Sequence, residues 1–182
     1  LQTNEPLRCA ALLPALSAIP GPIALLEIGA SAGLCLYPDR YSYRYAGGPA
    51  LDPVDGPSAV VLDSALRGPG AARARSTLAL PEVVWRAGVD LAPLDAADPA
   101  DRAFLAALVW PGERGRWERI GAALEIVAAD PPRMSRGDAT EPGVVAAAAA
   151  EAPPGATLVI TTPGVLPHIP VAGRRRLSAE ID

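Results

Sequence analysis

The spacing of apolar residues changes near the start of the chain, and this change predicts a helix followed by a buried strand. Over residues 4–18 apolar side chains recur at helical spacing, and a Pro-Gly-Pro turn at 20–22 ends the helix. Residues 23–28 then form a continuous apolar run, which is typical of a parallel strand covered on both faces. The start of the chain therefore predicts one helix and the first strand of a parallel sheet.

Strands and helices alternate along the rest of the chain. Strands are predicted over residues 82–91, 133–136 and 157–162, and helices over 99–110, 113–129 and 144–151. The apolar face of the 113–129 helix comprises Trp117, Ile120, Leu124 and Val127. This alternation predicts an α/β fold with a Rossmann-like, mostly parallel sheet and helices on both faces. Ligands of such sheets bind outside the carboxyl ends of the strands.

The length and apolar content favour a single domain. A chain of 182 residues that is 50% hydrophobic can bury a core of its own. We expect residues 1–182 to form one domain, with an N-terminal helix over 1–22 and a partial Rossmann-like core over 23–182. Two strand-like pieces, 42–45 and 59–62, are expected to pair as an inserted hairpin. Because the chain begins at Leu1 and residues 174–182 resemble a helix start, we expect a fragment truncated at both ends.

Charge and composition exclude several classes of function. The net charge of −4 gives no electrostatic reason to expect a nucleic acid or an anionic membrane as partner. No run of ~20 apolar residues is present to span a membrane. All 16 basic residues are arginine, which excludes a Schiff-base lysine and a Walker phosphate loop. Cys9 and Cys35 form no CxxC pair, so we expect reduced thiols and no metal site. These features predict a soluble, cytoplasmic protein whose partner is a small molecule.

The sequence EIGASAG at residues 27–33 predicts a ligand-binding loop between the first strand and a following helix. Its glycines let the backbone approach a ligand, and a helix N-terminus offers unpaired N–H groups. The alternative is a tight connection without a ligand. The dinucleotide pattern G-x-G-x-x-G does not fit, because Ser31 and Leu34 replace its second and third glycines, and NAD is therefore not expected.

Three segments resemble the motifs of S-adenosylmethionine-dependent methyltransferases. Glu27, two residues before Gly29, resembles the acid of the first motif, which continues to Gly33. That motif usually has another glycine where Ser31 stands. GVDLAPL at residues 88–94 resembles the second-strand motif, in which Asp90 would bind the ribose hydroxyls.

The Gly-Asp pair at residues 137–138 resembles the third such motif, in which Asp138 would contact the adenine amino group. The resemblance implies S-adenosylmethionine as cofactor. The two glycines would admit it, and Glu27 would support the loop and the ammonium side of the ligand. It implies an incomplete methyltransferase-type domain and does not identify the methyl acceptor.

Segments 3–8, 26–36, 81–94 and 130–138 also resemble one family of bacterial proteins, the domain of unknown function 2332 family. This resemblance covers nearly all of the chain. It implies the fold more than a reaction, and the members of that family are longer, in keeping with a fragment.

Two alternatives stay open beside a methyltransferase. GASAG at residues 29–33 also spells the G-x-S-x-G nucleophile elbow, and Ser31, Asp138 and His168 occur in the order of a hydrolase triad. The charge of Glu27 near the elbow would oppose a developing oxyanion. The other alternative is a ligand-binding protein without chemistry. In the methyltransferase reading, His168 is the candidate general base.

Overall fold

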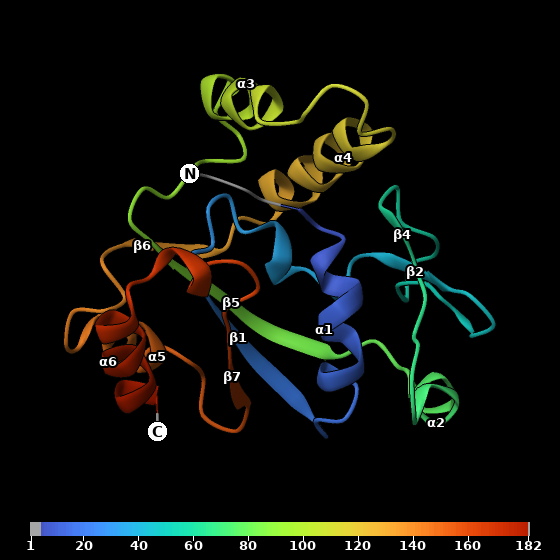
Figure 1. Cartoon of the computed structure of the whole chain (residues 1–182), viewed down its shortest axis with the longest axis horizontal. Coiled ribbons are helices and arrows are strands. Elements are labelled where there is room, and N and C mark those ends of the chain that lie inside the picture. Colours follow the sequence, from blue (N-terminus) through green and yellow to red (C-terminus); the bar gives the residue numbers. More distant parts are fainter. Residues whose placement is uncertain (1–4, 182) are drawn as a thin grey trace.

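Four parallel strands form the central sheet of this computed structural model, which describes residues 5–181. They are β1 (Pro22–Ile28), β5 (Glu82–Asp90), β6 (Arg133–Arg136) and β7 (Thr157–Thr161), and their spatial order is β6-β5-β1-β7. In chain order these are the first to fourth strands of the sheet, so the arrangement reads 3-2-1-4, as in Rossmann-like folds. Every pair is parallel. The predicted α/β class and the four predicted strands are confirmed (Figure 1).

Helices cover both faces of this sheet, as predicted. Alternate side chains of a strand point to opposite faces, and Leu25 packs in one buried cluster while Leu26 packs in another. The first cluster includes α1 (Arg8–Leu16) and α4 (Arg116–Ala129), and the second includes α5 (Val144–Ala149) and α6 (Val171–Ile181). Figure 1 shows α5 and α6 together on one side of the strands and α1 on the other.

The inserted segment forms a small second sheet whose pairing differs from the predicted hairpin. Its strands are β2 (Ser42–Tyr45), β3 (Ala50–Leu51) and β4 (Val61–Ser64), in the order β3-β2-β4. A short turn through Gly47 and Gly48 brings β3 antiparallel to one edge of β2, so β4 pairs parallel with the other edge. Tyr45 joins this sheet to the core, because its hydroxyl donates to the carbonyl of Ala10 at 2.7 Å. A short exposed helix, α2 (Ala71–Thr77), follows and was not predicted.

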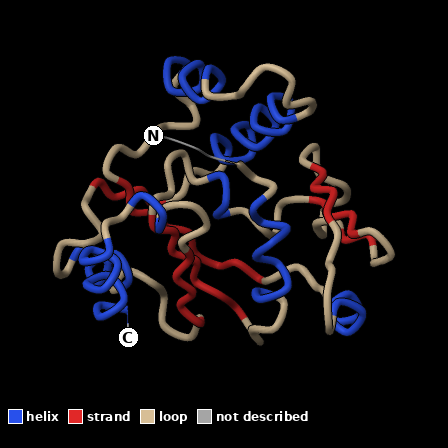
Figure 2. Tube along the Cα trace, viewed as in Figure 1, coloured by secondary structure: helices blue, strands red, loops and turns tan. Residues whose placement is uncertain are grey.

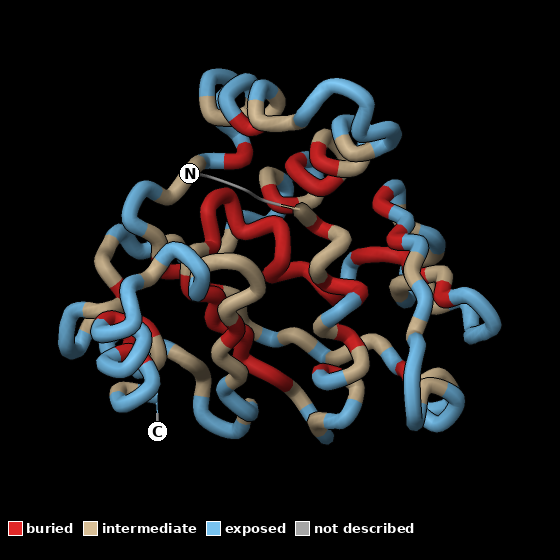
Figure 3. Tube along the Cα trace, viewed as in Figure 1, coloured by how far each residue is buried: buried red, intermediate tan, exposed pale blue. Residues whose placement is uncertain are grey.

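No α-helix follows the glycine loop, and that prediction was wrong. The chain makes a single 3₁₀ turn, η1 (Leu34–Leu36), and then reaches Pro38, which has no N–H to donate to a continuing helix. All three residues of the turn are buried, so the segment is core rather than an amphipathic helix. The loop therefore has no helix N-terminus behind it. Figures 2 and 3 show this irregular, buried course of the chain after β1.

The remaining helices differ from prediction at their ends. The predicted first helix began at Asn4, which lies outside the described residues, and α1 begins at Arg8. Asp98 caps α3 (Pro99–Ala107), accepting hydrogen bonds from two backbone N–H groups of its first turn at 2.7 and 3.0 Å. Trp117 was assigned to the buried face of α4 but is 51% exposed, because it lies one turn before the part of that helix that meets the core. Within residues 5–181, no helix is long and apolar enough to cross a membrane.

Candidate functional site

A cavity of about 290 Å³ lies at the carboxyl ends of all four strands of the main sheet. Its walls come from the ends of β1 and β5 and from the loops after β1, β5, β6 and β7. The chain runs from β1 through β5 to β6 and then returns across the sheet to β7, so the strand order reverses between β1 and β7. Open α/β sheets bind their ligands at such a switch point. The cavity therefore lies where the fold itself predicts a ligand.

The cavity brings together most of the residues that the sequence singled out. Five of them line it: Gly29, Ser31, Asp90, Asp138 and His168. Glu27 and Gly33 do not line it. Among the described residues, no group of three or more His, Cys, Asp or Glu side chains is arranged to hold a metal ion.

The loop after β1 has a left-handed backbone at every second residue. The φ angles are 74° at Gly29, 55° at Ser31 and 76° at Gly33. Within residues 5–181, Ser31 is the one non-glycine residue with a positive φ, a conformation that costs on the order of 1–3 kcal/mol and persists only where neighbours enforce it. Here the Ser31 carbonyl accepts from the N–H of Leu94 at 3.0 Å. The hydroxyl oxygen of Ser31 is buried at the cavity and has no hydrogen-bond partner among the described residues.

Asp90 ties the loops after β1 and β5 together. One carboxylate oxygen accepts from the Ser31 N–H at 2.8 Å, and the other accepts from the Ala92 N–H at 2.9 Å. This is the loop-capping role of an aspartate at the end of a strand. A carboxylate is also a group that can accept hydrogen bonds from the hydroxyl groups of a ligand. Asp90 both shapes the cavity and forms part of its wall.

The loop glycines have packing reasons of their own. A Cβ built on Gly29 would lie 2.5 Å from Cβ of Val165, and one on Gly33 would lie 3.0 Å from Cγ of Pro132. With their positive φ angles, both positions require glycine even without a ligand. Their presence alone therefore does not distinguish a binding loop from a tight connection.

Glu27 is buried beneath the loop and does not form part of the cavity wall. It is 2% exposed, it lies beside Thr161 in the register of β1 and β7, and its Oε2 has no hydrogen-bond partner in the described chain. Burial raises the pKa of Glu27 well above its usual value, Cys35 and Asp90 raise it further, and Arg8 opposes them. The environment therefore favours the protonated, neutral carboxyl.

Asp138 and His168 lie on other parts of the cavity wall. Asp138 accepts the Thr140 N–H at 2.8 Å, and this bond, followed by one with the Thr140 hydroxyl, lowers the pKa of Asp138. His168 is exposed at the end of η2 (Leu166–His168). The Asp138 carboxylate is thus engaged with Thr140, and the Ser31 hydroxyl has no base bonded to it in the described structure. The three residues share a cavity but do not form a hydrogen-bonded triad.

Arg8 also lines the cavity, although no functional role was predicted for this residue. It is the first residue of α1, and its guanidinium lies against Gly164, in the loop after β7. A Cβ on Gly164 would come within 2.1 Å of Nη1 of Arg8, so the arginine occupies the space that a larger residue at 164 would need. The sole sequence signal was its place in segment 3–8, which the family resemblance includes.

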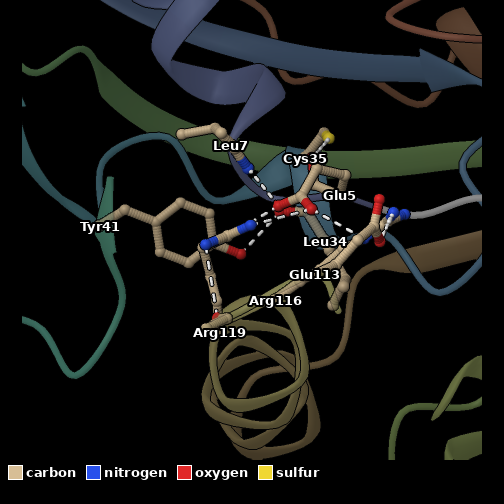
Figure 4. Close-up of polar contacts among 9 residues, drawn as sticks. Glu5, Leu7, Leu34, Cys35, Tyr41, Glu113, Arg116 and Arg119 are labelled. Atoms are coloured by element: carbon tan, nitrogen blue, oxygen red, sulfur yellow. Dashed lines mark hydrogen bonds and ion pairs between the residues drawn. The ribbon is translucent and has the colours of Figure 1, made fainter. Parts of the chain in front are cut away.

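The segment before Arg8 is anchored by a partly buried ion-pair network around Glu5 (Figure 4). The Glu5 carboxylate accepts from Nε and Nη2 of Arg119 at 2.8 and 3.0 Å, and Nε of Arg116 lies 2.9 Å from it. It also accepts the Leu7 N–H at 3.0 Å. Burial would raise the pKa of Glu5, but Arg119, the Leu7 N–H and Arg116 together lower it. This network joins the start of α1 to α4 and fixes the position from which Arg8 reaches the cavity.

Comparison with known proteins identifies one family. The model of the family described as "Uncharacterized protein conserved in bacteria (DUF2332)" matches residues 1–182. No curated protein and no solved structure matches the chain.

Proposed function

The chain belongs to the DUF2332 family, and we propose that it binds S-adenosylmethionine, as a methyltransferase-like domain, in the cavity at the carboxyl edge of its sheet. One observation carries this proposal. The residues that resemble three successive methyltransferase motifs lie at or just after the carboxyl ends of the first three strands of a 3-2-1-4 sheet, and Ser31, Asp90 and Asp138 all line the same cavity.

The residues present fit such a ligand in chemistry and order. The carboxylate of Asp90 is of the type that accepts hydrogen bonds from ribose hydroxyls, and Asp138, one strand further along the edge, suits an amino group of adenine. These features together favour a polar nucleoside ligand over an apolar one.

When bound, the cofactor would supply an electrophilic methyl group. The contribution of the chain would be mainly to orient it, since methyl transfer to a bound nucleophile gains most from proximity and alignment. His168, exposed at the cavity, is the candidate group to accept a proton from the methyl acceptor. A relative that binds the same ligand without transferring its methyl group would have the same cavity.

A serine hydrolase is the second candidate, because Ser31 has the left-handed backbone of a nucleophile elbow. Two observations weigh against it. The turn continues into a 3₁₀ turn rather than a helix, and Asp138 is bonded to Thr140 instead of orienting His168.

Ser31→Gly separates the two candidates. Glycine is the usual residue of the methyltransferase motif at this position, and it relieves the positive φ without removing the backbone N–H that Asp90 binds. If the proposal holds, calorimetric titration with S-adenosylhomocysteine gives binding at least as tight for Ser31→Gly as for the parent protein. Loss of esterase activity in the variant, with no binding of the nucleoside to the parent, would favour the hydrolase. Asp55→Asn, exposed in the inserted segment, is the control that leaves binding unchanged.

A further inference from the structure

Within the cavity, the acidic residues and Arg8 lie at opposite ends of the sheet edge. Asp90 ends β5 and Asp138 follows β6, on one side of β1, whereas Arg8 lies against Gly164 in the loop after β7, on the other side. A ligand lying along this edge therefore meets two carboxylates at one end and a guanidinium at the other. A complementary ligand would have hydrogen-bond donors or positive charge at the first end and a negatively charged group at the second.

From this arrangement we infer that Arg8 binds the carboxylate of the ligand's amino-acid portion; this rests on the function proposed above. Arginine suits the task because its planar fork donates two parallel hydrogen bonds to a carboxylate. The ribose and the base, which offer hydroxyl and amino donors, would then lie toward Asp90 and Asp138. The ligand class is an amino acid joined to a nucleoside, rather than a free nucleoside.

The protein holds Arg8 in place before any ligand arrives. Glu5 fastens the residues preceding α1 to Arg116 and Arg119 of α4, and the guanidinium of Arg8 fits against a position that must be glycine. A side chain that is already ordered loses less conformational entropy when it binds. Near Arg8, the carboxyl of Glu27 is buried, and burial raises its pKa more than the charge of Arg8 lowers it. The neutral carboxyl is therefore favoured. A neutral carboxyl attracts the guanidinium less strongly than a carboxylate would.

The test compares two ligands that differ in the amino-acid portion. S-adenosylhomocysteine carries the carboxylate, and 5′-methylthioadenosine has the same adenosine and sulfur without it. Calorimetric titration of the parent protein is expected to show tighter binding of the first. Arg8→Gln should weaken S-adenosylhomocysteine roughly 10- to 100-fold, as expected for loss of a charge-assisted hydrogen bond, and leave 5′-methylthioadenosine unchanged. Arg8→Lys, which keeps the charge but not the fork, should lie between.

Arg114→Gln is the matched control, because Arg114 is exposed between α3 and α4 and does not line the cavity. Thermal unfolding of each variant checks that the fold is intact. Equal weakening of both ligands by Arg8→Gln, or no weakening of either, would overturn the role of Arg8 while leaving the proposed function standing. No binding of either ligand to the parent protein would overturn both.

Discussion

Glu27→Gln tests the buried carboxyl beneath the glycine loop. Glutamine has the size of glutamate but does not ionise, so the substitution removes a titrating group and little packing. Glu27 is 2% exposed, and burial raises its pKa well above the usual value of 4.5. In the unfolded chain the same carboxyl ionises near pH 4.5.

The sign of the effect follows from these two states. Below pH 4.5 the carboxyl is protonated in both states. Above it the unfolded chain releases the proton while the folded protein keeps it, so stability falls by about 1.4 kcal/mol per pH unit. The fall stops at the folded pKa and the loss is then constant. Glu27→Gln escapes this loss and should exceed the parent in stability at neutral pH, with a difference that shrinks toward zero in acid.

Urea unfolding at pH 4, 5, 6 and 7, followed by far-UV circular dichroism, measures the difference directly. Glu82→Gln, at an exposed position that begins β5, is the control for the amide substitution itself. A difference for Glu27→Gln that does not change with pH would refute the reasoning. So would a less stable glutamine variant at pH 7, because it would show an ionised Glu27 stabilised by Arg8.

Three further predictions concern the loop, the Glu5 network and the thiols. Gly29→Ala places a Cβ 2.5 Å from the side chain of Val165 at a position with a left-handed backbone. Urea unfolding should show that the free energy of unfolding falls by about 2–5 kcal/mol. A change within about 0.5 kcal/mol would contradict the packing argument. Glu5→Gln should cost about 1–3 kcal/mol near neutral pH. Because the pKa of Glu5 is lowered, that cost should vanish as pH falls through it, and a cost unchanged at pH 3 would contradict the ion-pair account. Cys9 and Cys35 are 0% and 1% exposed. The pKa of the Cys35 thiol is raised by a hydrogen bond with Cys9 and, to a smaller extent, by burial. A thiol reagent should therefore modify both cysteines after unfolding and neither in the native protein, and rapid modification of the native protein would contradict their burial.

The main sheet could be predicted from the sequence because its strands carry local signals. The run at β1 and the stretch at β5 are bounded by proline turns and by residues that end strands, so their positions follow from neighbours in the chain. The strands fix the edge of the sheet, and with it the region of Gly29, Ser31 and Asp90. Their presence on one cavity wall followed from topology once the strand order was correct.

The features that the sequence did not predict depend on contacts between distant segments. The parallel pairing of β2 with β4 follows from β3 taking the other edge of β2 and from Tyr45 bonding to Ala10. The 3₁₀ turn after the loop is stabilised by burial of all its side chains, which overrides the expected helix. Arg8 reaches the cavity only because Glu5 is held by α4 and because Gly164 leaves room. None of these contacts leaves a periodic pattern.

Calorimetric titration of the unmodified protein with S-adenosylhomocysteine tests the central claim most directly. The account predicts saturable binding at one site per chain, because Ser31, Asp90 and Asp138 share a single cavity at the end of the sheet. S-adenosylmethionine should displace it. Absence of binding by both compounds to the folded protein would contradict the account and leave the cavity without a nucleoside ligand.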